Sequence, residues 1–383
     1  MVPPSDFLDN DKVFPHLGPY YIKRYVEENS NHKVYINFKT PYDSHFDDVD
    51  IIGFSSTTPQ YSYVREIVKN IFHEKTTVIG GPHVQHYSIE KPDLWDYIIT
   101  GDGCKPFLNI LNGYDPGNAL DDPNQLPHRD ESLHEYKYFL DSNPTTVIMT
   151  SRGCPNKCAF CENACTPIRL KSPSFVKKEI QECVELGFTG IMFFDDLFCI
   201  NIKRVRELCK VIKPFGIKFR CFAHARNFTT EMASILSDAG CVEIGYGAEH
   251  ADQEMLDLIN KRVSVEQIYG IVNIAHRYNI RVKAFLLLGL PSETHQTAKG
   301  VEDFVLTSGI DDFDVTIYYP YRGTQIADNI ENYDLFIENG NTIGYYKGKG
   351  GTAECSVRTS ALSTQEILAW RERIYSHHKR WKK

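Results

Sequence analysis

Short apolar runs and helical patterns alternate at regular intervals over the second half of the chain, and this alternation limits the possible folds most strongly. Six expected strands lie at residues 145–150, 190–194, 218–224, 242–247, 281–289 and 313–320, with helical patterns between them. One of these patterns opens with Thr229 as a cap and closes on Gly240. Another has Ser264 and Gln267 at the spacing of a capping box. Six βα units in succession predict a partial barrel of the TIM type, whose functional residues lie at the C-terminal ends of the strands.

The first part of the chain has its own alternation of strand and helix. Expected strands lie at 32–38, 49–56, 76–83 and 95–103, and residues 60–74 place apolar side chains on one helical face. This pattern predicts a parallel, doubly wound α/β sheet of the Rossmann type, in which ligands bind at the C-terminal strand ends. Small residues collect at those ends: Ser55, Ser56, Gly80, Gly81, Gly101 and Gly103. Glycine there lets a bulky ligand approach the backbone, but ordinary turns use glycine as well, so both interpretations stay open.

Composition shifts divide the chain into four expected parts. Residues 1–113 form the first α/β domain, 114–143 a linker rich in Pro, Asp and Asn, and 144–330 the barrel, with 331–383 as a C-terminal extension. A short helix is expected near 133–140, a mobile glycine-rich loop at 339–351 and an amphipathic terminal helix at 363–383.

The charge balance and the apolar pattern limit partners and location. The 383 residues carry a net charge of −8, which argues against broad binding to nucleic acid or to anionic membranes. No apolar run approaches the length of a membrane span, and the first residues lack the features of a signal peptide. We therefore expect a cytoplasmic protein, in which eleven cysteines point to metal binding or catalysis rather than to disulfides.

Four cysteines lie within twelve residues directly after the first barrel strand. Cys154, Cys158 and Cys161 have the spacing C-x3-C-x2-C, without the second close pair or the histidines that a structural zinc site needs. Three thiolates on one loop would hold an iron–sulfur cluster with one iron left open for a ligand. Cys165 could close the site as a fourth ligand, but we expect it to face the core. The other seven cysteines are expected to be small buried hydrophobic residues.

This cysteine loop resembles the signature of the radical S-adenosylmethionine (SAM) enzymes, and weaker motifs follow in the family's order up to about Asp328. The resemblance implies a 4Fe–4S cluster on the three cysteines, with SAM bound to the open iron and cleaved to a 5′-deoxyadenosyl radical. It also implies SAM contacts for five residues: Phe160, before the last cysteine of the triplet; Asp195 and Asp196, in place of the family's Gly-Gly-Glu segment; Arg226, after the third strand; and Glu249, in a segment similar to G-x-E-S. In that last segment His250 replaces the serine. Carboxylates suit the ammonium group and hydroxyls of SAM, although Asp195 and Asp196 also fit as helix caps.

Residues 15–112 resemble the cobalamin-binding domain found in one branch of this family. The resemblance implies that the six Ser and Gly residues at the strand ends contact cobalamin. The cobalt-ligating pattern D-x-H-x-x-G is absent, because no Asp lies two residues before His16. His83 is the other histidine at a strand end, and we expect it to stabilise its loop. Cobalamin would then bind without a histidine on the cobalt.

Three functions remain open from the sequence. The first is a cobalamin-dependent methyltransferase acting on an unactivated centre of a small molecule or peptide, with flavodoxin or ferredoxin as electron donor. The second is a radical SAM rearrangement, cyclisation or oxidation enzyme with a vestigial cobalamin domain. The third is a regulatory or binding protein that carries the cluster without catalysis.

Overall fold

The computed structural model describes residues 14–37, 46, 48–72, 74–86, 94–340 and 353–378. The chain divides into two compact units, the first ending at Tyr136 and the second running from Lys137 to the C-terminus. None of the helices within the described ranges has both the length and the apolar character needed to cross a bilayer.

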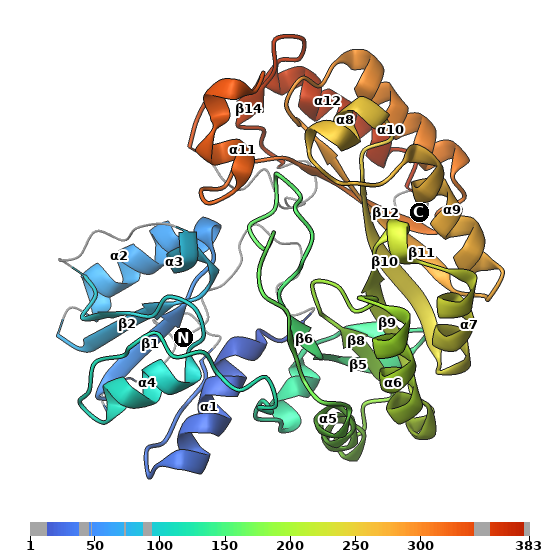
Figure 1. The fold of residues 1–383 in the computed structure, drawn as a ribbon. Helices are drawn as coiled ribbons and strands as arrows, with labels where there is room; N and C mark the ends of the chain where they lie inside the picture. Colours follow the sequence, from blue (N-terminus) through green and yellow to red (C-terminus); the bar gives the residue numbers. More distant parts are fainter. Residues whose placement is uncertain are drawn as a thin grey trace. The chain divides into compact units, whose positions relative to one another are not determined.

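The first unit is built on a three-stranded parallel sheet. The strands β1 (Ile51–Ser55), β2 (Thr76–Gly80) and β3 (Tyr97–Ile98) lie in chain order. The helices are α1 (Leu17–Asn29), α2 (Tyr61–Ile71), α3 (Pro82–His86) and α4 (Cys104–Leu111), and η2 (Thr58–Gln60) is a short 3-10 turn. Figure 1 shows α2 and α4 on opposite faces of the sheet, which is the doubly wound arrangement predicted from the sequence.

Each face of this sheet has its own apolar core. Ile52, Phe54 and Ile79 pack with apolar residues of α2 on one face. Val78 and Ile99 pack with Ile110 of α4 on the other. Burial on both faces explains why the strands are almost continuously apolar in sequence.

The strand expected over residues 32–38 is wrong for residues 32–37, and residue 38 lies outside the described part of the chain. The side chains of α1 take up the backbone groups that a strand would use. The Val34 N–H donates to Glu27 Oε1 at 3.1 Å, and Lys23 Nζ donates to the Val34 carbonyl at 2.7 Å. The sheet therefore has three described strands rather than four.

The second unit is a curled sheet that forms part of a barrel. Its parallel strands are β5 (Asn143–Ile148), β8 (Gly190–Phe193), β9 (Lys218–Ala223), β10 (Cys241–Glu249), β11 (Arg281–Leu288) and β12 (Asp312–Ile317), in chain order. The short strand β4 (Phe139–Leu140) pairs antiparallel with β5 and ends the sheet. All six strands of the predicted partial barrel are confirmed.

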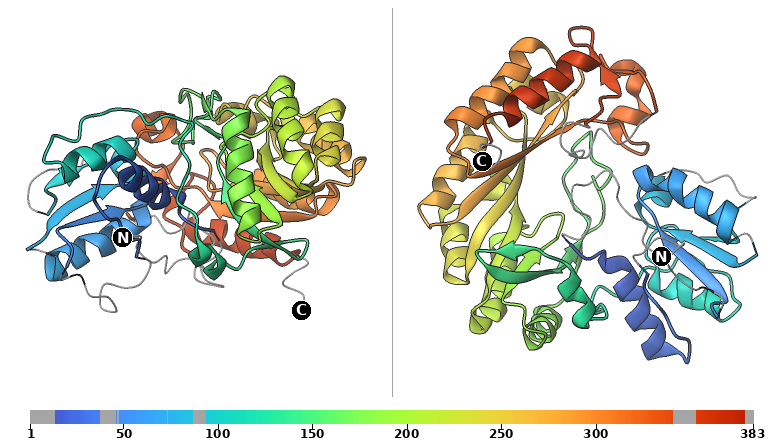
Figure 2. Two further views of the ribbon diagram at one scale, coloured as in Figure 1. Left: turned by 90° about the horizontal axis from the view of Figure 1, so that it is seen from below. Right: turned by 180° about the vertical axis from the view of Figure 1, so that it is seen from behind.

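Helices cover the convex face of the curled sheet (Figures 1 and 2). They are α5 (Pro173–Glu185), α6 (Ile202–Ile212), α7 (Thr230–Asp238), α9 (Val265–His276) and α10 (His295–Thr307), with the turn η4 (Lys213–Phe215) after α6. The predicted caps are present: Thr229 accepts from the Met232 N–H, and Ser264 and Gln267 form a capping box. Alternate residues of each strand face either these helices or the concave side. On β10 the Tyr246 hydroxyl donates to the Ile268 carbonyl of α9, so its neighbours Gly245 and Gly247 face the concave side.

The C-terminal extension protects the edge of the sheet. Helix α12 (Thr364–Tyr375) packs on β12, where the Val315 N–H donates to the Tyr375 hydroxyl and Arg371 Nε donates to the Val315 carbonyl. These bonds satisfy backbone groups that an edge strand would otherwise expose. The predicted terminal helix is confirmed over these residues, while residues 379–383 and most of the expected glycine-rich loop lie outside the described ranges.

Smaller elements complete the second unit and the segment before it. They are α8 (Gln253–Leu258), α11 (Gln325–Asp328), η6 (Ile330–Asn332) and the hairpin of β13 (Phe336–Ile337) with β14 (Val357–Arg358). The short helix expected near 133–140 is present only as a 3-10 turn up to residue 135 and is wrong beyond it. The 3-10 turn η3 (Glu131–Glu135), begun by an Asp130 cap, and strand β4 occupy that segment. The seven cysteines outside the loop are buried, as predicted.

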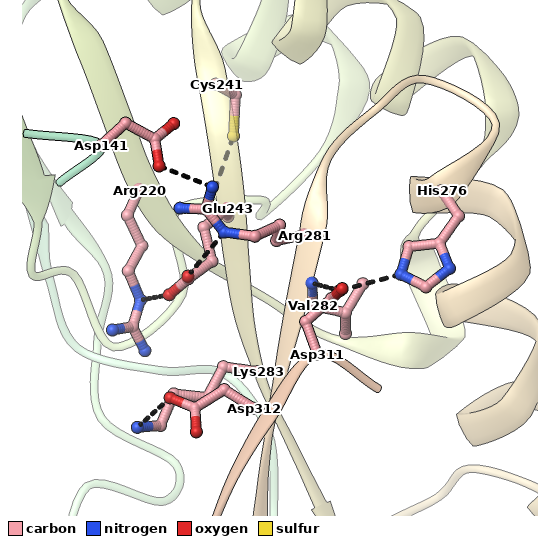
Figure 3. A network of polar contacts seen from close by, with 10 residues as sticks. All are labelled: Asp141, Arg220, Cys241, Glu243, His276, Arg281, Val282, Lys283, Asp311 and Asp312. Carbon is pink, nitrogen blue, oxygen red and sulfur yellow. Dashed lines mark hydrogen bonds and ion pairs between the residues drawn. The ribbon is translucent and has the colours of Figure 1, made fainter. Parts of the chain in front are cut away.

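A chain of ion pairs closes the N-terminal end of the partial barrel (Figure 3). Arg220 Nε of β9 lies 3.1 Å from Glu243 Oε1 of β10, and Arg281 Nε of β11 lies 3.4 Å from Glu243 Oε2. Arg281 Nη1 also donates to Asp141 Oδ1 at 2.6 Å. Asp141 lies in the turn between β4 and β5, at the opposite edge of the sheet. The ion pairs therefore join the two sides of the curl where no strand joins them.

Glu243 is the central member of this chain, and its loss should destabilise the unit. Glu243→Gln should lower the free energy of unfolding by about 3–5 kcal/mol, because the buried Arg220 would lose its charged partner. Asp141→Asn should cost only about 0–1 kcal/mol, because its pair with Arg281 is partly exposed. Denaturant unfolding of the full chain, followed by near-ultraviolet circular dichroism, measures both values. Similar small losses for the two variants would contradict a structural role for the Glu243 pair.

Candidate active site

The cysteine loop leaves the barrel directly after β5, at the C-terminal end of the strands. Its base is a small antiparallel ribbon of β6 (Ser151–Arg152) with β7 (Arg169–Leu170). Gly153 has φ +89, and a Cβ there would lie 2.3 Å from the Pro167 carbonyl oxygen. Only glycine fits this position, because the two arms of the loop meet at backbone distance.

Asp195 fixes the start of the loop by accepting hydrogen bonds from its first residues. It lies just after β8 with 1% of its surface exposed. Its carboxylate accepts hydrogen bonds from the Thr150 N–H at 2.6 Å, from Thr150 Oγ1 at 2.5 Å and from Ser151 Oγ at 2.8 Å. Burial raises the pKa of Asp195, and these hydrogen bonds lower it again in part. Its oxygens are thus directed at the loop backbone and its first side chains.

Asp196 and Arg204 also hold the loop. The exposed Asp196 carboxylate accepts from the Gly153 N–H at 3.1 Å and from Asn163 Nδ2 at 2.9 Å. Arg204 of α6 donates through Nη2 to the carbonyls of Thr150 and Lys171, on the two arms of the ribbon. Both aspartates predicted from the sequence therefore lie against the cysteine loop, and Asp196 is the more exposed of the two.

The three predicted cysteine ligands lie on one loop that is built from successive turns. Cys158 is buried and its carbonyl accepts from the Cys161 N–H, while Cys154 and Cys161 are half-buried. Burial, together with the nearby thiols of Cys158 and Cys154, raises the pKa of the Cys161 thiol to about 12. Among the described residues, no three His, Cys, Asp or Glu side chains converge on a position for a single metal ion.

The expectation that Cys165 faces the core is wrong. Cys165 is exposed, and its backbone is in the left-handed region with φ +59. Its N–H donates to the Asn156 carbonyl, which closes the turn and directs the side chain outward. The core position that the helical spacing suggested does not exist, because the segment after Cys161 is a turn rather than a helix.

The middle of the loop is held by residues that lie much later in the sequence of the second unit. The Ala159 N–H donates to the Ile259 carbonyl, and the Ala159 carbonyl accepts from the Ile326 N–H of α11. Asn260 Nδ2 donates to the Lys157 carbonyl at 2.6 Å. Residues distant in sequence thereby fix Cys158 and Phe160 on both sides of Ala159.

Glu249, predicted at the end of the fourth strand, forms a buried ion pair. Its Oε1 lies 2.7 Å from Lys261 Nζ, and both side chains are about nine-tenths buried. Burial would lower the pKa of Lys261, but the charges of Glu249 and of Cys158 raise it above its usual range. The ammonium lies 5.9 Å from the centre of the Phe160 ring. The pair therefore lies beside the cysteine loop and the aromatic residue predicted there.

Gly247 makes room for this pair. A Cβ on Gly247 would lie 1.9 Å from Glu249 Oε1 and 2.8 Å from Lys261 Nζ, so the charged groups rest directly on the strand backbone. Glu249 itself has φ +61, which a non-glycine residue adopts only when its surroundings hold it there. The end of β10 is therefore shaped for a polar site rather than for regular pairing.

His250, which stands where the family has serine, lies in the core. Its Nε2 is 3.2 Å from Glu293 Oε1, its Nδ1 accepts from the Asp252 N–H, and both His250 and Glu293 are fully buried. Glu293 also accepts from the Gly289 N–H. His250 thus ties the loop after β10 to the loop after β11.

Arg226 lies in the turn η5 (Ala225–Asn227), after β9. Its Nη2 donates to Asn156 Oδ1 at 3.3 Å, and Asn156 Nδ2 lies 3.5 Å from Cys154 Sγ. His224 precedes this turn, and burial lowers its pKa to about 3, with Lys261 and Arg226 adding to the effect. The structure therefore gathers all five predicted SAM residues around the cysteine loop.

Lys261 and His224 were not predicted from the sequence. Lys261 lies in the connection between α8 and α9, between two residues with left-handed backbone, Asn260 and Arg262. Nothing in the local pattern of that connection indicates an inward-facing lysine. His224 ends a predicted strand, which was the only signal for it.

The residues predicted to contact cobalamin lie in the first unit. Ser55 ends β1 and Ser56 follows it, Gly80 ends β2, and the other glycines lie in the loops that follow β2 and β3. Gly81 has φ +95, and a Cβ there would lie 2.7 Å from the Ser56 nitrogen, so this glycine serves the protein's own turn. Gly103 packs closely on Ile22. Gly101 also has φ +95, but no atom of the described residues lies within 4 Å of a Cβ built there, which leaves space above its backbone among those residues.

His83 is held inside the first unit. Its ring stacks on Tyr61 with centroids 4.0 Å apart, and Nδ1 lies 3.2 Å from Thr58 Oγ1. Burial lowers its pKa to about 4. With 5% of its surface exposed, His83 contacts the segment that follows β1, and its expected role in stabilising its own loop stays a prediction.

Comparison with known proteins places these features in a family. The model described as the radical SAM superfamily matches residues 148–305. An uncharacterized methyltransferase of Pyrococcus horikoshii is 27% identical over 357 residues, covering 82% of this chain and 77% of the relative. The anaerobic magnesium-protoporphyrin IX monomethyl ester cyclase of Rubrivivax gelatinosus is 24% identical over 377 residues, covering 87% of this chain and 65% of the relative, just under two thirds of its length.

The fold also matches a solved structure over both units. The radical SAM methyltransferase TsrM from Kitasatospora setae, solved with cobalamin and a 4Fe–4S cluster bound, superposes with a TM-score of 0.70. The match covers 92% of this chain and 79% of TsrM at 14% identity, so it is a likeness of fold. The family match begins at the last residue of β5, includes the cysteine loop and extends into α10. The chain therefore contains a domain of the radical SAM superfamily.

Proposed function

We propose that this protein is a cobalamin-dependent radical SAM methyltransferase acting on an unactivated centre. The observation that carries the proposal is the loop of Cys154, Cys158 and Cys161 at the C-terminal end of the barrel strands, inside the matched radical SAM domain. When bound, a 4Fe–4S cluster on these thiolates supplies the electron for reductive cleavage of SAM. A third reading, a regulatory protein without catalysis, has no observation in its favour.

The side chains around the loop suit the polar groups of SAM. Glu249 and Asp196 provide carboxylates for the ammonium group, and Lys261 provides a cation for the carboxylate, with Arg226 beside it. Phe160 lies under the Lys261 ammonium and offers a ring face to the adenine. Asp195 is assigned a different part: it holds the loop through Thr150 and Ser151 and acts on SAM only through the loop's position.

Cobalamin is assigned to the first unit. The likeness to TsrM supports this, because the match extends over 92% of the chain and TsrM was solved with cobalamin bound. Space above Gly101, beside Gly80 at the neighbouring strand end, allows a large ring to approach the backbone. His83 is occupied by Tyr61 and Thr58, which supports binding without a histidine on the cobalt.

The cyclase relative supports one alternative function, a radical SAM cyclisation, rearrangement or oxidation. The methyltransferase from Pyrococcus horikoshii aligns with a larger share of its own length and at higher identity, which favours methyl transfer. For either reaction we propose flavodoxin or ferredoxin as electron donor, a cytoplasmic location, and domain limits of 1–113, 144–330 and 331–383. The substrate is not assigned.

Replacing any one of Cys154, Cys158 and Cys161 by Ala should abolish the iron–sulfur absorbance and SAM cleavage after anaerobic reconstitution. Cys165→Ala should leave both intact, because Cys165 is exposed, whereas Cys158 is buried and Cys154 and Cys161 are half-buried. Iron and sulfide analysis, absorbance spectra and the release of 5′-deoxyadenosine give the measurements. Loss of the cluster in the Cys165 variant would overturn the assignment of an open iron.

Glu249→Gln should weaken SAM binding by roughly ten- to a hundredfold, because a charge-assisted hydrogen bond contributes about 1.5–3 kcal/mol. The glutamine keeps the shape that Gly247 accommodates, and the cluster spectrum should not change. Glu254→Gln, at an exposed position in the first turn of α8, is the matched control. Equal SAM affinity for both variants on titration would give Glu249 a purely structural role.

Protein purified anaerobically from cobalamin-fed cells should contain corrinoid, and its Co(II) form should show no nitrogen superhyperfine splitting in electron spin resonance. His83→Ala and His16→Ala should leave that spectrum unchanged. A nitrogen pattern that disappears in either variant would show a histidine ligand. Complete absence of corrinoid after reconstitution would favour the cyclisation, rearrangement or oxidation alternative instead.

A further inference from the structure

His224 carries a hydrogen-bond donor that has no partner within the described structure. Its ring is buried, with 6% of the residue's surface exposed, and no acceptor lies within reach of Nε2 among the described residues. Nδ1 accepts from the Arg226 N–H at 3.3 Å as the cap of η5, so the proton of the neutral ring is on Nε2. A buried donor without a partner is rare in native proteins and calls for a bound acceptor.

The position of His224 in the sheet places it at the SAM site. Ala223 of β9 pairs with Tyr246 of β10, so His224 lies next to Gly247 on the neighbouring strand. Gly247 is the residue on which Glu249 Oε1 and Lys261 Nζ rest. Since side chains alternate along a strand, His224 shares the concave face with Phe222, whose ring packs against Gly245.

The charges around His224 select the kind of acceptor. Burial, and after it the charges of Lys261 and Arg226, lowers the pKa of His224 and so favours the neutral ring, which can donate through Nε2. The Glu249 carboxylate pairs with the single charge of Lys261, so the net positive charge of this group comes from Arg226. A net positive charge and a neutral N–H donor suit an anionic group, and SAM presents one such group, its carboxylate.

We infer that His224 Nε2–H donates a hydrogen bond to the carboxylate of bound SAM, between Lys261 and Arg226. The inference rests on the proposed function and adds to it a neutral donor that positions the methionyl end of SAM. The same His224 ring, through Nδ1, orients the turn that carries Arg226. One imidazole would thus bind SAM through Nε2 and cap the turn η5 through Nδ1.

Two substitutions of His224 distinguish the role of Nδ1 from the role of Nε2. Asparagine places an oxygen two bonds beyond Cβ, as Nδ1 is, and keeps the cap for the Arg226 N–H while removing the distal donor. Glutamine places an N–H one atom further, as Nε2 is, and keeps the donor while losing the cap. His224→Asn should therefore weaken SAM binding by roughly ten- to a hundredfold at unchanged melting temperature. His224→Gln should bind SAM nearly as wild type and melt at a lower temperature.

Anaerobic isothermal titration of the cluster-loaded full chain measures the affinities, with the cluster absorbance as a check on each variant. Methylthioadenosine, which lacks the amino and carboxylate groups, is the second probe. Its affinity should be the same for wild type and His224→Asn. The reverse order of the two variants, or an equal loss for both probes, would overturn the inference. If the loaded wild type does not bind SAM at all, the proposed function itself fails, and this assignment fails with it.

Discussion

The hydrogen bonds that Asp195 accepts beneath the cysteine loop are the interaction on which the rest of the site depends. They join the end of β8 to the residues that follow β5, so two neighbouring strands set the point at which the loop leaves the barrel. Arg204 binds both arms of the ribbon from α6. A buried carboxylate and a buried guanidinium with hydrogen-bonded partners are costly to rearrange, because each would be left unsatisfied in the interior. The loop is therefore held in one position relative to the strands, and the positions of its three cysteine thiols are set by it.

The second constraint is the absence of a side chain at Gly247. The Glu249 carboxylate and the Lys261 ammonium occupy the space where a Cβ would be, and the left-handed backbone of Glu249 turns its side chain back over the strand. In this buried setting the two charges interact more strongly than at a surface. The pair brings a positive charge close to the thiols of Cys158 and Cys161. The Glu249–Lys261 pair, the Phe160 ring and the cysteine thiols thereby lie together at the C-terminal end of β10. The ion pairs of Glu243 lie at the opposite end of the strands and stabilise the curl of the sheet.

Much of the fold follows from local pattern. The six barrel strands, the caps at Thr229 and Ser264 and the helix at the C-terminus agree with the sequence because each depends on residues close to one another along the chain. Residues 32–37 do not follow their pattern, since Glu27 and Lys23 of the preceding helix compete for the Val34 backbone groups. Cys165 also departs from its pattern, because a turn that closes on Asn156 replaces the expected helix.

By itself, the sequence determined the cysteine triplet, its place after the first barrel strand and the acidic residues at the strand ends, because spacing along the chain is enough to define each of them. The tertiary structure decided which of those acids is buried and which is reachable: Asp195 lies beneath the loop and Asp196 beside it. It also decided that Lys261 meets Glu249 and that His224 lies next to Gly247. These pairings join different strands and loops, and their distances depend on how the sheet curls, which no local pattern of side chains encodes.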